Sequence, residues 1–279
     1  MRAQIAAAAL AAAGLLSAAT QASASVPRVA LAAVYNSSGE AGQYVQSSPN
    51  RHFRDVRDTF QATQAQLGVS GGGTGNNGGV GLQLCSNATG QAIQFGLIPD
   101  GSVFQLAYQA GALAQHDPAT TNDACATGGI LPAPIVISAL ASYDTIPVGD
   151  TVSLEIYYNS RSGWVTLSVT DLAQGGTEEF HFRDASCGRW CDFTEPGAGV
   201  RDLAAPALSA PADIPLVTFE GLRATQYNGR HWSFSHWTTV ADSFNLGGSV
   251  TDAPADLLQA GPLGGGGTTF TVLSGNPAP

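Results

Sequence analysis

Apolar and polar residues alternate along many short segments of the chain. In TVSLEIYY (151–158), valine, leucine and isoleucine occupy every second position, and serine and glutamate lie between them. A period of two residues predicts a β-strand with one buried face and one polar face. After the first 24 residues, no segment keeps an apolar period of 3.6 residues for long. We therefore expect an all-β protein.

Nine segments carry the strand pattern most clearly: 51–63, 80–85, 92–98, 103–109, 151–158, 164–172, 178–183, 216–225 and 268–273. Turn-forming residues, such as Gly149-Asp150 and Gln174-Gly175-Gly176, separate neighbouring segments. Many short strands joined by such turns are typical of an antiparallel β-sandwich.

The first 24 residues have a different composition from the rest. They contain an early arginine, an alanine- and leucine-rich run, and Ala22-Ser23-Ala24 at their end. This pattern predicts a signal peptide over 1–24, followed by a single β-sandwich domain with glycine-rich loops over 25–279. No other stretch approaches the roughly 18 to 20 apolar residues that cross a bilayer. We expect a secreted, extracellular protein that does not bind a membrane.

The charge balance argues against nucleic acid as a partner. Removal of Arg2 with the signal peptide leaves 10 arginines against 21 acidic residues, a net charge of −11, and the chain has no lysine. An acidic surface repels phosphate groups. Nucleic-acid binding is therefore not expected.

Four cysteines, Cys85, Cys125, Cys187 and Cys191, lie in the part expected to be exported. Disulfides persist outside the cytoplasm, so we expect two of them, and the sequence leaves three pairings open. A zinc site is the alternative, but a single Cys-x3-Cys without nearby histidines indicates one only weakly. The five histidines form no ligand pattern, and we expect neither a metal nor another cofactor.

Glutamines occupy the non-core positions of three predicted strands. Alternation in VGLQLC, AIQFGL and VFQLAYQ gives the non-core face Gln83, Gln94, Gln105 and Gln109, and in TVSLEIYY it gives that face Glu155. If these strands belong to one sheet, small residues such as Ala92, Gly96 and Ala107 leave room for a groove beside the amides. Two interpretations follow, an ordinary solvated sheet face and a ligand-binding face.

Several familiar catalytic motifs are absent from the sequence. There is no GxSxG, HExxH, kinase or Walker motif. A glycosidase with a sandwich fold would need two carboxylates on one face of a strand. The nearest candidates, Glu179 and Asp184, are five residues apart and would point to opposite faces.

The order of segments resembles that of the glutamic peptidases, or eqolisins, along nearly the whole mature chain. AGQYVQSSPNRHFRDVRDTFQAT is similar to the opening hairpin of that family, and VGLQLCSNATGQAIQFG to its WVGIDG and ILQTG strands. IPVGDTVSLEIYYNSRSGWVTLSVTDLAQGGTEEFHFRD gives the best match in order and spacing. The resemblance implies a lectin-like (concanavalin A-like) antiparallel β-sandwich of two packed sheets, with a Gln–Glu pair on its concave face.

The resemblance also implies site residues. Gln94 stands where the family has the glutamine of QTG, and Glu195 follows Cys187 by eight residues where the family has nine. The AEWIVE motif of the family is missing, and Glu155 and Asp202 are the alternative acids. Substrate contacts are expected from Gln83, Gln105, Gln109, Glu155 and Trp190.

As a function, the resemblance implies an acid endopeptidase with a Gln–Glu dyad. The alternative is a catalytically inactive relative that binds a peptide or glycan. The expected partner is a polypeptide substrate or ligand, and the chain is expected to act as a monomer. The resemblance further favours disulfides Cys85–Cys187 and Cys125–Cys191.

Overall fold

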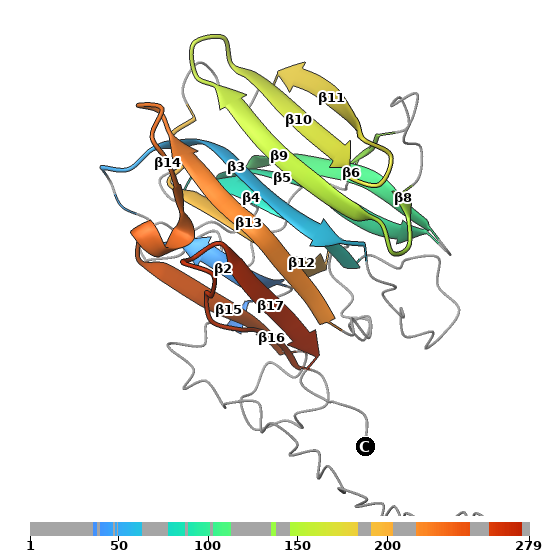
Figure 1. Cartoon of the computed structure of the whole chain (residues 1–279). Coiled ribbons are helices and arrows are strands. Elements are labelled where there is room, and N and C mark those ends of the chain that lie inside the picture. Colours follow the sequence, from blue (N-terminus) through green and yellow to red (C-terminus); the bar gives the residue numbers. More distant parts are fainter. Residues whose placement is uncertain are drawn as a thin grey trace, which may run out of the picture. The chain divides into compact units, whose positions relative to one another are not determined.

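Strands make up almost all of the regular structure in the computed structural model of the chain (Figure 1). The structure describes residues 36–37, 40–46, 48, 50–62, 78–86, 89–100, 103–112, 135–137, 146–183, 191–202, 216–245 and 257–274. The chain divides into two units, Met1–Ala30 and Leu31–Pro279, and every described residue belongs to the second. The expected signal peptide lies outside the described residues and stays a prediction.

The described elements are 17 strands and one turn of 3-10 helix. They are β1 Asn36–Ser37, β2 Glu40–Val45, β3 Phe53–Gln61, β4 Gly78–Cys85, β5 Gln91–Asp100, β6 Val103–Ala112, β7 Ile135–Val136, β8 Ile146–Pro147, β9 Thr151–Asn159, β10 Trp164–Asp171, β11 Gly176–Arg183, β12 Glu195–Asp202, β13 Leu216–Gln226, β14 His231–Ser233, η2 Phe234–His236, β15 Thr239–Asn245, β16 Leu257–Ala260 and β17 Thr269–Ser274. In this part of the chain, no helix is long and apolar enough to span a membrane.

The strands form two antiparallel sheets. Sheet A has the order β16–β17–β13–β3–β9–β10–β11, with β14 also paired to β13. Sheet B has the order β15–β2–β12–β4–β5–β6, and both β7 and β8 pair with β6. Strand β15 also pairs with β16, so it joins the two sheets along one edge. The two-residue β1 lies parallel to β15.

One apolar core lies between the sheets. Val152, Leu154 and Ile156 of sheet A are fully buried, as are Leu82 and Ile93 of sheet B. In Figure 1, strands β3, β9 and β13 of sheet A lie across β4, β5 and β12 of sheet B. The expected all-β, lectin-like sandwich is confirmed.

All nine predicted strands are present, with ends that differ by a few residues. The segment 51–63, for example, is observed as Phe53–Gln61, and 151–158 as Thr151–Asn159. The alternation also holds, because every second residue of β9 is buried. Gly163, with a φ of 72°, supplies the left-handed backbone that closes the β9–β10 turn.

The main strand missed by the alternation is β12, whose sequence is EPGAGVRD. Proline and glycine in succession favour a strand end or a loop, yet β12 lies in sheet B between β2 and β4. Gly199 of β12 is accommodated because Gly42 of β2 and Gly81 of β4 face it, and Gly197 leaves room for the ring of Tyr44.

Candidate active site

Three glutamines lie side by side across sheet B. Gln83 of β4 is in register with Gln94 of β5, and Gln94 with Gln109 of β6. Directly paired residues of antiparallel strands share a face, so the three side chains form one row. Gln94 Nε2 donates to Gln83 Oε1 over 3.0 Å. This hydrogen bond orients the Gln94 amide.

The glutamine row is buried, although it is not part of the apolar core. Gln83 is 1% exposed, Gln109 5% and Gln94 7%. The interpretation as an ordinary solvated face is therefore wrong for these positions. Polar groups withdrawn from water interact more strongly with one another and with any bound group than they would at the surface.

Glu195 belongs to the same face as Gln94. It is the first residue of β12, in register with Cys85, and Gly197 two residues later is in register with Gln83. Residues two apart in a strand share a face. Strands lie about 4.8 Å apart and rise about 3.4 Å per residue, which places the Cα atoms of Gln94 and Glu195 about 12 Å apart. The Glu195 side chain is 2% exposed.

Three other predicted site residues are Gln105, Asp202 and Trp190. Gln105 lies on the glutamine face of β6, four residues before Gln109, and is half-buried. Asp202 ends β12 and pairs with Gly78, five residues beyond the position in register with Gln83. Trp190 lies outside the described residues, so its role stays a prediction.

Glu155 was expected on the glutamine face, and this expectation is wrong. It belongs to β9, between β3 and β10 of sheet A, and lies on the side facing away from the core. Alternation gave its orientation within its own sheet correctly, but strand pairing puts that sheet on the opposite side of the sandwich from Gln94.

A row of glycines crosses sheet B beside the glutamine row. Gly42, Gly199, Gly81 and Gly96 are paired in succession on β2, β12, β4 and β5, and Ala107 continues the row on β6. A Cβ added to Gly81 would lie 2.6 Å from Gly96 Cα, and one added to Gly42 would lie 2.8 Å from Gly199 Cα. The strands therefore approach one another so closely that this part of the face is bare backbone.

Tyr44 of β2 is a neighbour of the glutamine row that the sequence analysis did not single out. It is in register with Gly197, and its ring occupies the space that a Cβ of Gly197 would need. The side chain is 2% exposed. Its position in the sequence could have indicated this place. Tyr44 follows Gly42 by two residues in EAGQYV, so alternation puts the two residues on the same face.

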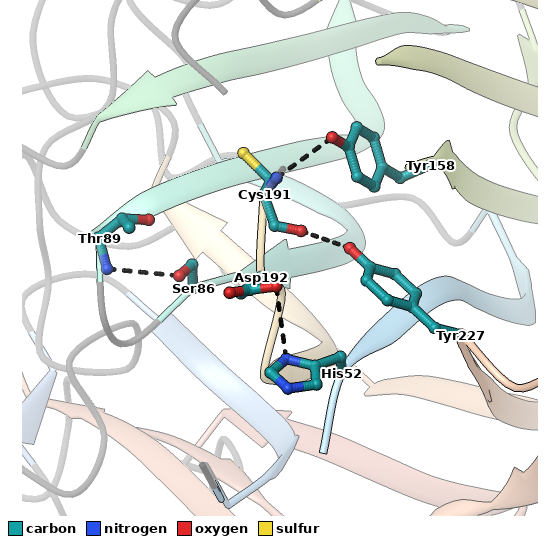
Figure 2. Close-up of polar contacts among 7 residues, drawn as sticks. All are labelled: His52, Ser86, Thr89, Tyr158, Cys191, Asp192 and Tyr227. Atoms are coloured by element: carbon teal, nitrogen blue, oxygen red, sulfur yellow. Dashed lines mark hydrogen bonds and ion pairs between the residues drawn. The ribbon is translucent and has the colours of Figure 1, made fainter. Parts of the chain in front are cut away.

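The segment that leads into Glu195 is held from both sides by tyrosines (Figure 2). The Cys191 N–H donates to Tyr158 Oη over 3.2 Å, and Tyr227 Oη donates to the Cys191 carbonyl oxygen. The Phe193 carbonyl oxygen accepts from the Phe53 N–H over 2.7 Å, and the Thr194 N–H donates to the Cys85 carbonyl oxygen over 2.8 Å. Four backbone groups before Glu195 are therefore fixed.

Tyr227 is suited to this role because it stays neutral. Burial, and to a lesser degree the nearby Tyr158 and Asp192, raise the pKa of Tyr227. Its ring also stacks on His52, whose Nδ1 lies 3.6 Å from an Asp192 carboxylate oxygen. Figure 2 shows these contacts around Cys191.

Removal of the Tyr227 hydroxyl tests this anchoring. We expect Tyr227→Phe to lower the free energy of unfolding by about 1 to 3 kcal/mol, because the buried Cys191 carbonyl loses its donor. Urea denaturation followed by tryptophan fluorescence measures the change. Tyr157→Phe is the matched control, since the ring contact of Tyr157 with Arg54, at 5.7 Å, does not need the hydroxyl. Equal effects of the two substitutions would contradict the anchoring role.

The described cysteines, Cys85 and Cys191, are both disulfide-bonded, and neither is a free thiol. Cys125 and Cys187 lie outside the described residues, so the expected pairing stays a prediction. In the described ranges, no group of three or more histidine, cysteine, aspartate or glutamate residues is placed to hold a metal ion.

Comparison with solved structures gives matches to peptidases of one kind. A scytalidoglutamic peptidase with a peptide-based transition-state analogue has a TM-score of 0.54 and 16% identity, over 85% of this chain and 98% of that one. The same enzyme with a transition-state analogue inhibitor gives 0.54 and 18% over the same shares. SCP-B, an eqolisin in complex with the tripeptide Ala-Ile-His, gives 0.50 and 17%, also over 85% and 98%. The expected likeness to glutamic peptidases is thus confirmed for the fold.

No family model matches the sequence. A search of curated proteins also gives no match.

Proposed function

We propose that the protein is an acid endopeptidase, exported after removal of residues 1–24, in which Gln94 and Glu195 act on a peptide bond. The observation that carries the proposal is the register of sheet B, which brings an amide and a carboxylic acid to one buried face from segments about a hundred residues apart. Both side chains are less than a tenth exposed.

Peptide hydrolysis would use the two side chains in different roles. The Glu195 carboxylate removes a proton from a water molecule, whose oxygen attacks the carbonyl carbon of the scissile bond. The Gln94 Nε2–H group donates a hydrogen bond to the oxyanion of the tetrahedral intermediate. The C–N bond then breaks as Glu195 returns the proton to the leaving amine. Because an amide does not titrate, Gln94 can play this part in acid.

The surroundings of Gln94 support this division of roles. Gln83 Oε1 accepts from Gln94 Nε2, so the amide nitrogen is held in place before substrate arrives. Preorganised donors in a site withdrawn from water stabilise developing charge more than mobile ones do. The separation of about 12 Å between the two Cα atoms, estimated from strand spacing, leaves room for a peptide group and a water between the side chains.

A polypeptide is the proposed substrate class. The similar solved peptidases hold a peptide-based transition-state analogue in one case and a tripeptide in another. On sheet B, the glycine row beside Gln94 carries no side chains, so an extended peptide can lie closer to the sheet there than over strands covered by side chains.

The test is cleavage of a denatured polypeptide between pH 2 and pH 7, with the products identified by mass spectrometry. We expect the wild-type protein to cleave in acid. Gln94→Ala should lower kcat by about a hundred- to a thousandfold, the usual effect of removing an oxyanion donor. Gln61→Ala is the matched control, because Gln61 is an exposed glutamine of sheet A whose Nε2 donates to the Gly149 carbonyl. It should leave the rate unchanged.

Two results would contradict the proposal. One is cleavage at the same rate by wild type and Gln94→Ala. The other is binding of the denatured polypeptide without cleavage at any pH, which would instead support the inactive, peptide-binding alternative.

A further inference from the structure

Asp58 is a carboxylic acid inside the sandwich. It lies on β3 between Val56 and Phe60, is in register with Leu154 of β9, and is 1% exposed. The Thr59 N–H donates to its Oδ1 over 2.7 Å. Its Oδ2 has no hydrogen-bond partner among the residues that the structure describes. A carboxylate at this position would be withdrawn from water, and the backbone groups of Thr59 and Glu220 would offset only part of that cost.

Asp58 lies opposite an irregularity in sheet A. The pairing of β3 with β13 shifts between Glu220 and Arg223, where β13 carries one extra residue and Gly221 has a φ of 84°. A β-bulge of this kind interrupts the backbone ladder. Asp58 is the residue of β3 that faces the interruption, and the Glu220 backbone there lowers the pKa of its carboxyl group as a hydrogen-bonding neighbour.

A second acidic site lies on the outer face of the same strand. Asp55 is 6% exposed, and its Oδ1 accepts from Thr225 Oγ1 over 2.9 Å. Asp55 is in register with Tyr157, two residues beyond Glu155 on β9, so the two acids are diagonal neighbours on one face. The Asp55 carboxyl group is close enough to raise the pKa of Glu155 as a hydrogen-bonding neighbour. Two carboxyl groups can share a hydrogen bond only while one of them keeps its proton.

In the described strands, three arginines and one histidine lie near the Asp55–Glu155 pair, and of these Arg57 and Arg223 are exposed. Arg57 of β3 is directly opposite Glu155, and Arg223 of β13 is opposite Arg57. On the other side, Ser168 of β10 faces Glu155, and Glu179 of β11 faces Ser168. Glu179 lies 3.4 Å from His181. Arg54 lies over the ring of Tyr157.

Around Asp58, the facing side chains are apolar. Leu154 of β9 is opposite Asp58, and the core positions of β4 on sheet B are Leu82 and Leu84. Glu220 of β13 is the charged group that acts on Asp58, and it repels the anion. Among the residues that the structure describes, no basic side chain acts on Asp58 to offset that repulsion.

Both sites bind protons more tightly in the folded chain than in an unfolded one. Burial, opposed by the Thr59 and Glu220 backbone groups, raises the pKa of Asp58 well above 3.8. Hydrogen bonding with Asp55, burial and the Asp55 charge, opposed by the Arg57 charge, raise the pKa of Glu155 from 4.5 to about 8. Between the unfolded and the folded pKa, unfolding releases a proton, and stability falls as pH rises.

We propose that Asp58 and the Asp55–Glu155 pair form a pH-sensitive switch in sheet A, which keeps the sandwich stable in acid and loosens it when both sites lose their protons. The switch would restrict the folded protein to acidic surroundings. It does not depend on the proposed peptidase activity, because the groups lie on sheet A and the readout is stability.

Urea denaturation of the full mature chain at constant ionic strength, at each pH from 4 to 8, tests the switch. We expect the wild-type midpoint to fall as pH rises. Each site adds at most about tenfold per pH unit to the unfolding constant, and half-exposed Glu155 adds less than that. Glu155→Gln and Asp58→Asn should each flatten the dependence, because an amide carries no titrating proton.

Glu179→Gln is the matched control, since the Glu179 side chain is 53% exposed on the same outer face. It should keep the wild-type dependence on pH. If Asp58→Asn does not fold, Asp55→Asn and Glu155→Gln still test the paired site. The proposal is overturned if the wild-type midpoint is constant or rises with pH. It is also overturned if the variants that fold show the wild-type slope.

Discussion

Replacement of Glu195 by glutamine should lower kcat/KM for a polypeptide substrate by about a hundred- to ten-thousandfold, the range that a positioned general base contributes. Glutamine keeps the size of the side chain and can fill the same space, but it cannot accept a proton from water. Glu195 is 2% exposed and begins β12 with its preceding backbone held by four hydrogen bonds. The substitution should therefore remove the chemistry and leave the fold. Initial rates of peptide release at acidic pH measure the effect.

Glu155→Gln is the matched control for this loss of activity. Glu155 lies on the other sheet, facing away from the core, so its replacement should leave the acid rate unchanged. Circular dichroism and the urea midpoint of Glu195→Gln establish that the variant is folded. A folded Glu195→Gln protein that cleaves as fast as wild type would exclude Glu195 as the base and leave Asp202 as the next acid to test.

Gly81→Ala should be among the most destabilising single substitutions in sheet B, with a loss of about 3 kcal/mol or more in the free energy of unfolding. An added Cβ would lie 2.6 Å from Gly96 Cα, a backbone atom that cannot rotate away. The β4–β5 pairing would have to open at this row, and Gln83 and Gln94 lie in the next row. Urea or thermal denaturation measures the loss.

Gly175→Ala separates crowding from backbone conformation. Gly175 has a φ of 75°, yet a Cβ there would meet no atom within 4 Å. Its replacement should cost only about 1 to 2 kcal/mol, the strain of a left-handed residue with a side chain. If Gly81→Ala were no more costly than Gly175→Ala, the close approach of the strands at the glycine row would not be a constraint on the fold.

The sequence predicted the part of the fold that depends on local pattern. Strand β9 is the plainest case, because its valine, leucine and isoleucine alternate with polar residues and all three are fully buried. The same parity correctly took Gln94 off the core face. Side-chain direction within a strand is a local property, set by the pleat of the backbone.

What the pattern could not predict depends on pairing between distant segments. Glu155 has the same parity signal as Gln94, but nothing within its own strand shows that its neighbours are β3 and β10. EPGAGVRD has no strand pattern of its own. Gly199 fits because Gly42 and Gly81 face it across the sheet, and Gly197 fits because the Tyr44 ring takes the space beside it. Burial of the glutamine row likewise arises only in the assembled sheet.

The position of β12 affects how the protein can mature. Strands β2 and β4 precede residue 86, but the strand between them begins at Glu195. A chain that has emerged only as far as β11 would present two open strand edges at the centre of sheet B. Open strand edges can pair with the wrong strand. In such a chain Gln94 would have no Glu195 beside it. Under the proposed function, activity on a peptide bond would therefore begin only after β12 has closed the centre of sheet B.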